Sequence, residues 1–128
     1  MVIGFGDVTN DTMVLTIDTS VDITAFDISV QSMLCDSGFG GAAGDASFFV
    51  STTNDIGMAQ NSGCNILGYY QGEGTSYIPA GTNEDLTSWS YLGSSEEICI
   101  MHAFYATEVG GDWLEANLDA NYCLDYTF

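Results

Sequence analysis

The stretch MVLTIDTSVDITAFDISV, residues 13–30, decides the fold class of this chain. Apolar residues occupy every second position on both sides of a polar corner at Thr19 and Ser20. The apolar set is Met13, Leu15, Ile17, Phe26, Ile28 and Val30. A period of two places one set of side chains in a core and the other set in water. The stretch therefore predicts two β-strands that form an amphipathic hairpin, against which the later segments pack.

Seven further segments have strand-like composition and are separated by turns rich in Gly, Asn, Asp and Ser. They are residues 2–8, 46–52, 65–70, 86–92, 98–106, 113–118 and 122–128. About nine short strands without a convincing helix are typical of an antiparallel β-sandwich. The sequence therefore predicts an all-β fold. The length of the chain suits a single domain over residues 1–128.

Three segments carry more detailed expectations. Residues 98–106 are apolar on both faces, which predicts a central strand that is covered on each side. Residues 35–45 are rich in Gly and are expected to form an irregular surface loop. Residues 113–120 are the one stretch with a helical alternative, because Leu114 and Leu118 are spaced by one helical turn.

All the charged side chains of the chain have the same sign, apart from one histidine. The sequence holds 18 acidic residues, no Lys or Arg, and His102, which gives a net charge of −18. Nothing in it can neutralise a phosphate, so nucleic acid and anionic membrane surfaces are excluded as electrostatic partners. A basic protein, a divalent cation or a neutral surface remains open as a partner, and so does a glycan. No segment reaches the roughly 20 apolar residues that a membrane span requires.

The four cysteines, Cys35, Cys64, Cys99 and Cys123, predict disulfides, with free buried thiols as the alternative. Four cysteines allow three pairings, and none of them lies in the close pairs typical of zinc sites. Sequential pairing would close loops of about 25–30 residues, each stabilising the fold by roughly 3–4 kcal/mol. Disulfides imply an oxidising environment, so we expect an extracellular or cell-surface protein. The first residues lack a signal peptide, so either the sequence is that of the mature form or the expectation of secretion is wrong.

The N-terminal segment, residues 2–8 with the sequence VIGFGDV, has two interpretations. It is either an edge strand of the domain's own sheet, or a strand that completes the sheet of a neighbouring copy. In the second case residues 1–9 would be the shared segment. The apolar side chains that would carry it are Val2, Ile3, Phe5 and Val8.

Several segments resemble a known family of modules. They are Val14-Leu15-Thr16-Ile17 followed by residues 21–28, Ile78-Pro79-Ala80-Gly81 with Leu86-Thr87, and Ile98-Cys99-Ile100 followed by residues 106–114 and Cys123. Together these strand and turn motifs resemble the cohesin-like, immunoglobulin- or jelly-roll-like β-sandwich modules of secreted bacterial proteins. The resemblance implies a surface module that binds a protein or a glycan, or that is used as a pilin-like fibre subunit.

No catalytic constellation is present, so the chain is not expected to be an enzyme. His102 stands alone among apolar residues, and the acidic residues are expected to form a solvated surface. A weak calcium site is conceivable in Gly-rich turns that contain Asp36 and Asp45, or Glu108 and Asp112, because calcium prefers oxygen ligands. No other cofactor is expected. Asn10 begins an N-glycosylation sequon, Asn-Asp-Thr.

Five aromatic residues are candidates for stacking on sugars, although burial in a core or an interface is the stronger expectation. They are Tyr69, Tyr70, Tyr77, Trp89 and Tyr91. The sequence as a whole favours a non-enzymatic, extracellular structural protein. In this prediction the partners are copies of the chain itself, which form a fibre or appendage by β-strand exchange. The alternative is a cohesin-like binding module for a protein or glycan partner.

Overall fold

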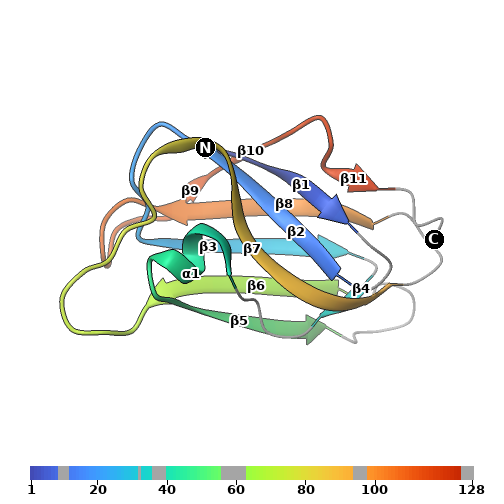
Figure 1. The fold of residues 1–128 in the computed structure, drawn as a ribbon, viewed down its shortest axis with the longest axis horizontal. Coiled ribbons are helices and arrows are strands. Elements are labelled where there is room, and N and C mark those ends of the chain that lie inside the picture. The colour runs from blue at the N-terminus through green and yellow to red at the C-terminus, as the bar shows by residue number, and fades with distance from the viewer. Residues whose placement is uncertain (9–11, 32, 36–39, 56–62, 94–97, 125–128) are drawn as a thin grey trace.

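The computed structural model describes residues 1–8, 12–31, 33–35, 40–55, 63–93 and 98–124. Within these residues eleven strands form two sheets that pack face to face (Figure 1). The predicted all-β sandwich is therefore confirmed. The helices in this part of the chain are all too short to span a membrane.

The first sheet has the strand order β10-β1-β2-β7-β4. Its strands are β1 (Val2–Val8), β2 (Thr12–Thr19), β4 (Met33–Cys35), β7 (Gly81–Gly93) and β10 (Asn117–Leu118). The second sheet has the order β11-β8-β3-β6-β5, and β9 also pairs with β8. Its strands are β3 (Ala25–Gln31), β5 (Phe48–Asp55), β6 (Gly63–Tyr70), β8 (Ile98–Ala106), β9 (Leu114–Glu115) and β11 (Cys123–Leu124). The neighbouring strands run antiparallel except β1 and β10, which are parallel.

The predicted hairpin of residues 13–30 is wrong, because its two strands lie in different sheets. β2 pairs with β1 and β7, whereas β3 pairs with β6 and β8. The chain between them crosses from one sheet to the other, and there Ile23 and Ile78 exchange backbone hydrogen bonds of 2.9 and 2.8 Å. The alternation of apolar and polar residues shows which side chains face the core. The same alternation occurs in a hairpin and in two strands that face each other across a core, so it does not show which strands pair.

The Gly-rich region expected to be irregular contains one turn of helix, α1 (Gly41–Asp45). Ala42 and Ala43 of this turn are buried. Their small side chains let the helix pack closely against β7, with which α1 makes its main contacts. The helical alternative for residues 113–120 is wrong, since β9 and β10 occupy this region.

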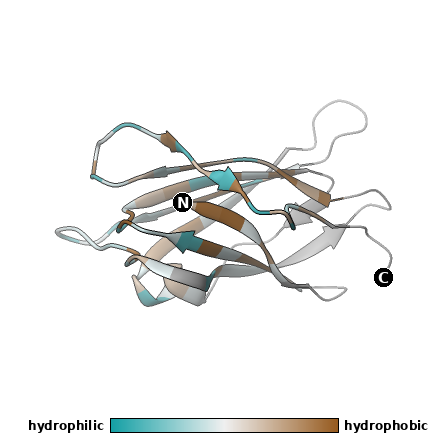
Figure 2. Cartoon of the chain, turned by 90° about the horizontal axis from the view of Figure 1, so that it is seen from above, coloured by the Kyte–Doolittle hydropathy of each residue, from teal (hydrophilic) through white to brown (hydrophobic). Residues whose placement is uncertain are grey.

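The core lies between the two sheets and draws apolar side chains from both of them. Hydrophobic and hydrophilic residues alternate along the strands, as Figure 2 shows. In the second sheet Phe26 is fully buried, and its ring stacks on that of Phe48 with centroids 6.3 Å apart. In the first sheet Trp89, a candidate for sugar stacking, is 0% exposed and belongs to the core.

The expectation that β8 is covered on both faces is wrong for the middle of this strand. Met101 is 57% exposed, and His102 beside it is also exposed. The register explains this, because Ser29 pairs with His102 but the next residue, Val30, pairs with Ile100. Met101 is therefore the extra residue of a β-bulge, which turns its side chain and that of His102 away from the core.

Disulfide formation is confirmed for the C-terminal part of the chain. Cys99 and Cys123 are bonded, and they lie directly opposite each other on β8 and β11 with Cα atoms 4.1 Å apart. The bridge thus joins neighbouring strands of one sheet. Cys64 is disulfide-bonded as well. The side chain of Cys35, its expected partner, lies outside the part that the structure describes.

Replacing Phe26 with Ala should test the core. Removal of this buried, stacked ring should lower the free energy of unfolding by about 3–5 kcal/mol. The measurement is urea denaturation followed by circular dichroism. Phe49→Ala is the matched control, because Phe49 is on the same sheet but 47% exposed, and its replacement should cost less than about 1 kcal/mol. Equal losses for the two variants would contradict the described core.

Candidate functional site: the N-terminal strand and its groove

β1 occupies the domain's own sheet, between β2 and β10. On one side it pairs antiparallel with β2 at positions that include Ile3 opposite Ile17 and Phe5 opposite Leu15. On the other side it pairs in parallel with β10, with Ile3 opposite Leu118. Of the two interpretations of this segment, the structure contains the intramolecular arrangement. The strand lies one position inside the edge, because the short β10 covers it.

The inward face of β1 fills the core of the first sheet. Ile3 is 0% exposed and Phe5 is 3% exposed, and both belong to the core that the two sheets share. Val2 points the other way and is half-buried. The side chain of Val8 lies outside the part that the structure describes. Burying side chains of this size stabilises a fold by roughly 1.5–3 kcal/mol each.

The outward face of β1 carries two glycines that leave room for neighbouring side chains. A Cβ atom on Gly4 would lie 2.8 Å from Cβ of Asp119 and would also overlap the carboxamide of Asn121. A Cβ atom on Gly6 would lie 2.9 Å from Cγ2 of Thr16. We call the space between β2 and residues 117–121, which β1 fills, the groove. Side chains at Gly4 and Gly6 would displace the residues that line it, and glycine allows those residues to approach β1 closely.

Residues 117–121 hold the free side of β1 through a row of hydrogen bonds. The backbone N–H groups of Asn117 and Asp119 donate to the carbonyls of Met1 and Ile3, at 2.9 and 2.8 Å. The side-chain amide of Asn121 donates to the carbonyl of Phe5 at 2.5 Å. These bonds follow every second carbonyl of the strand.

The groove around β1 is therefore complementary to its sequence in two ways. Its floor accepts large apolar side chains at Ile3 and Phe5, and at the two glycines beside them any side chain would make Asn121, Asp119 or Thr16 shift. This pattern makes the segment VIGFG a specific insert rather than a generic strand. Chemically, the arrangement can bind an extended apolar segment, and it offers no reactive group.

Of the described residues in the predicted calcium pairs, only Glu108 and Asp112 lie in the same turn. Asp45 lies on α1, Glu108 and Asp112 lie in an exposed turn, and Asp36 and Asn10 lie outside the described residues. In the described part of the chain, no group of three or more His, Cys, Asp or Glu side chains is placed to hold a metal ion. The structure thus adds no ligand set to the weak calcium prediction.

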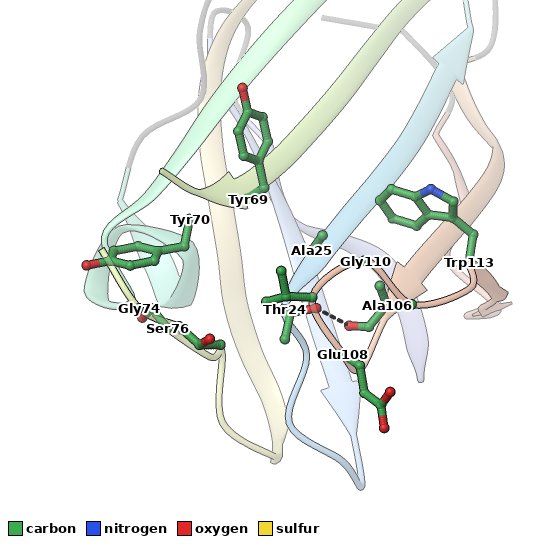
Figure 3. A pocket seen from close by; sticks show the side chains of 13 residues that line it. Thr24, Ala25, Tyr69, Tyr70, Gly74, Ser76, Ala106, Glu108, Gly110 and Trp113 are labelled. Atoms are coloured by element: carbon green, nitrogen blue, oxygen red, sulfur yellow. Dashed lines mark hydrogen bonds between the residues drawn. The ribbon is translucent and has the colours of Figure 1, made fainter. Parts of the chain in front are cut away.

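One feature of the structure was missed at the sequence level. Tyr69 and Tyr70 line a pocket together with Trp113, whose exposed indole comes from the loop that follows β8 (Figure 3). The signal in the sequence is the turn Gly110-Gly111-Asp112 that precedes Trp113, because turns of this composition lie at the surface. The folded chain brings β6 and this loop together, which sequence spacing does not reveal.

Comparison of the chain with protein-family models, with curated proteins and with solved structures finds no match. The resemblance to cohesin-like modules therefore stays a prediction, and the β-sandwich is the part that the structure confirms.

Replacing Gly4 with Ala should test the fit of β1 in its groove. The added methyl group collides with Asn121 and Asp119, so the free energy of unfolding should fall by about 1–3 kcal/mol. Asn121→Ala alone should cost about 1 kcal/mol, through the lost hydrogen bond to Phe5. The double variant should lose less than the sum of the two, because truncating Asn121 makes room for the methyl group.

Gly44→Ala is the matched control, because a Cβ atom there meets nothing within 4 Å. It should leave the stability unchanged or raise it by up to about 1 kcal/mol. Strictly additive losses for Gly4→Ala and Asn121→Ala in urea denaturation would show that the two residues are not in contact.

Proposed function

We propose that this chain is a non-enzymatic structural subunit that assembles with copies of itself by exchange of β1. The observation that carries the proposal is the two-sided fit of the segment VIGFG in its groove, with Ile3 and Phe5 inward and Gly4 and Gly6 outward.

The exchanged state would repeat the contacts of the closed state. β1 of one copy would lie between β2 and β10 of the next and make the same pairings. The two states then differ mainly in the connection between β1 and β2, so their free energies per subunit are close and protein concentration decides between them. In the arrangement proposed here the rotation between successive copies does not close a ring, so the head-to-tail contact extends into a filament.

Charge opposes this assembly at low ionic strength. Every copy carries a net charge of −18, and Asp18 and Asp119 lie beside the groove itself, since Asp18 pairs with Val2 and Asp119 binds Ile3. Filaments therefore require screening by salt or the binding of cations. The bridge between Cys99 and Cys123 supports an extracellular or cell-surface location, where disulfides persist.

A free peptide with the sequence of residues 1–8 should shorten the filaments. During exchange the peptide would occupy grooves that β1 has left. Filament growth would stop there, because the peptide has no groove of its own to accept the β1 of a further copy. The measurement is the filament length by negative-stain electron microscopy, as the peptide concentration is raised over a fixed amount of intact protein.

The control is the same peptide with Ile3→Asp and Phe5→Asp, which cannot bury charged side chains in the groove. This control should leave the filament length unchanged. The proposal fails if the intact protein stays monomeric at every protein and salt concentration, or if the two peptides act equally on the filaments.

Added salt should lower the protein concentration at which assembly begins. The Debye length falls from about 10 Å at 0.1 M to about 3 Å at 1 M, which removes most of the repulsion between copies. Size-exclusion chromatography at a series of NaCl concentrations measures the shift. Dissociation of assemblies at high salt would show that attractive charge contacts, rather than a buried apolar strand, hold the copies together.

A binding module remains the second candidate function, because the structure contains a pocket with exposed aromatic side chains. The residues that line this pocket all lie outside β1. A ligand there would leave the groove of β1 free, so binding and assembly are compatible in one molecule.

A further inference from the structure

A pocket of about 260 Å³ lies at the end of the second sheet where β3 begins and where β6 and β8 end (Figure 3). Loop residues 74–76 and 108–111 complete its wall. Pockets for small molecules have volumes of about 300–1,000 Å³, so this one lies just below that range. It suits one ring-sized group, with room for the rest of a longer ligand outside.

The floor of the pocket is made of small residues that are held firmly in place. Ala25 and Ala106 lie opposite each other on β3 and β8. The backbone N–H and the hydroxyl of Thr24 both donate to the carbonyl of Ala106, at 2.8 and 3.2 Å. Figure 3 shows this pair near the middle of the view, with Tyr69 above it and Trp113 to its right. Small side chains thus form the floor at this end of the sheet.

The two aromatic side chains are accessible to a ligand, and one of them is fixed in orientation. Trp113 is 49% exposed and Tyr69 is partly exposed. The ring of Tyr69 packs edge-on against Phe49 with centroids 5.9 Å apart. Its hydroxyl accepts a hydrogen bond of 3.0 Å from the amide of Gln71. Pre-oriented rings lower the entropy cost of binding.

A tight turn places one carboxylate at the rim. The N–H of Gly111 donates to the carbonyl of Glu108 at 3.0 Å, and Gly110 adopts a φ of 74° that favours glycine. Glu108 is exposed and is the only charged residue among the described residues that line the pocket. Its carboxylate points away from Tyr69 and Trp113 in Figure 3, so it is placed to accept hydrogen bonds from the part of a ligand that extends outside the pocket.

We propose that this pocket binds a neutral saccharide. The C–H face of a sugar ring is apolar and packs on aromatic rings such as Tyr69 and Trp113. Sugar hydroxyls donate well to a carboxylate, which is the role of Glu108. An anionic ligand is repelled by the net charge of −18. A simple cation gains little from one solvated carboxylate, since exposed ion pairs contribute only about 0–1 kcal/mol.

The site is independent of the exchange of β1, because none of its lining residues lies on β1. Saccharide binding therefore does not require filaments. If saccharide binding failed, filament formation would be unaffected. A saccharide site on a surface subunit would let the assembled or the single protein attach to a glycan-bearing surface.

The test is an array of immobilised glycans probed with the intact protein. The neutral arm carries hexose, N-acetylhexosamine, deoxyhexose and pentose ends, the acidic arm carries sialylated and sulfated glycans, and free choline serves as the cationic probe. The affinity for the best-bound neutral glycan is then measured by calorimetry for the protein and its variants. We expect binding in the neutral arm alone.

Trp113→Ala should weaken the binding of that glycan at least about tenfold, as expected for loss of a central aromatic contact. Glu108→Gln should weaken it less, because an amide oxygen still accepts a hydrogen bond. Ala25→Leu, which fills the floor instead of removing a side chain, should weaken it as strongly as Trp113→Ala. Tyr122→Ala is the matched control, because Tyr122 is 43% exposed and lies outside the pocket, and it should bind like the unchanged protein.

The proposal would be overturned if the protein bound no neutral glycan at millimolar concentration. Preferential binding of choline or of the acidic glycans, or an equal loss for Trp113→Ala and Tyr122→Ala, would also overturn it. Circular dichroism of each variant separates a loss of binding from a loss of folding. Ala25→Leu and Glu108→Gln keep the test decisive if Trp113→Ala does not fold.

Discussion

The apolar contact between the two sheets must stabilise this fold against the repulsion of its own charges. Because the chain has a net charge of −18 and no Lys or Arg, it has almost no attraction between opposite charges. Such attraction could otherwise offset the cost of bringing the acidic residues together. The core takes large side chains from both sheets, among them Phe26 and Trp89, which are fully buried. The strand β1 matters in this balance, because Ile3 and Phe5 complete one face of that core.

Much of the fold was predictable because burial in a sandwich follows a period of two. The strands containing Leu15 and Ile28 were expected from alternation alone, and both residues are buried. The pairing of those strands was not predictable, since one alternation pattern serves a hairpin and two facing sheets equally. The exposure of Met101 depends on a bulge opposite Val30, which is a property of the partner strand. A helix of five residues formed from glycine and alanine is likewise decided by contact with β7.

The candidate sites were less predictable than the fold, for related reasons. The apolar side chains of β1 and its glycines were visible in the sequence. Their meaning was not, because it depends on Asn121 and Asp119, which come from the other end of the chain. The pocket joins Tyr69 to Trp113 across a gap in the sequence that no spacing rule spans. Sequence thus indicated which side chains were available, and the folded chain determined which of them meet.

The bridge between Cys99 and Cys123 has a mechanical consequence. Residues 117–121, which hold the free side of β1 by hydrogen bonds, are separated from Cys123 by Tyr122 alone. A pull applied at the N-terminus is passed through these bonds to the C-terminal segment, and the covalent bridge carries it into β8, which pairs with β3 inside the second sheet. Tension on one sheet is therefore shared with the other, and the hydrogen bonds along β1 resist it together in shear.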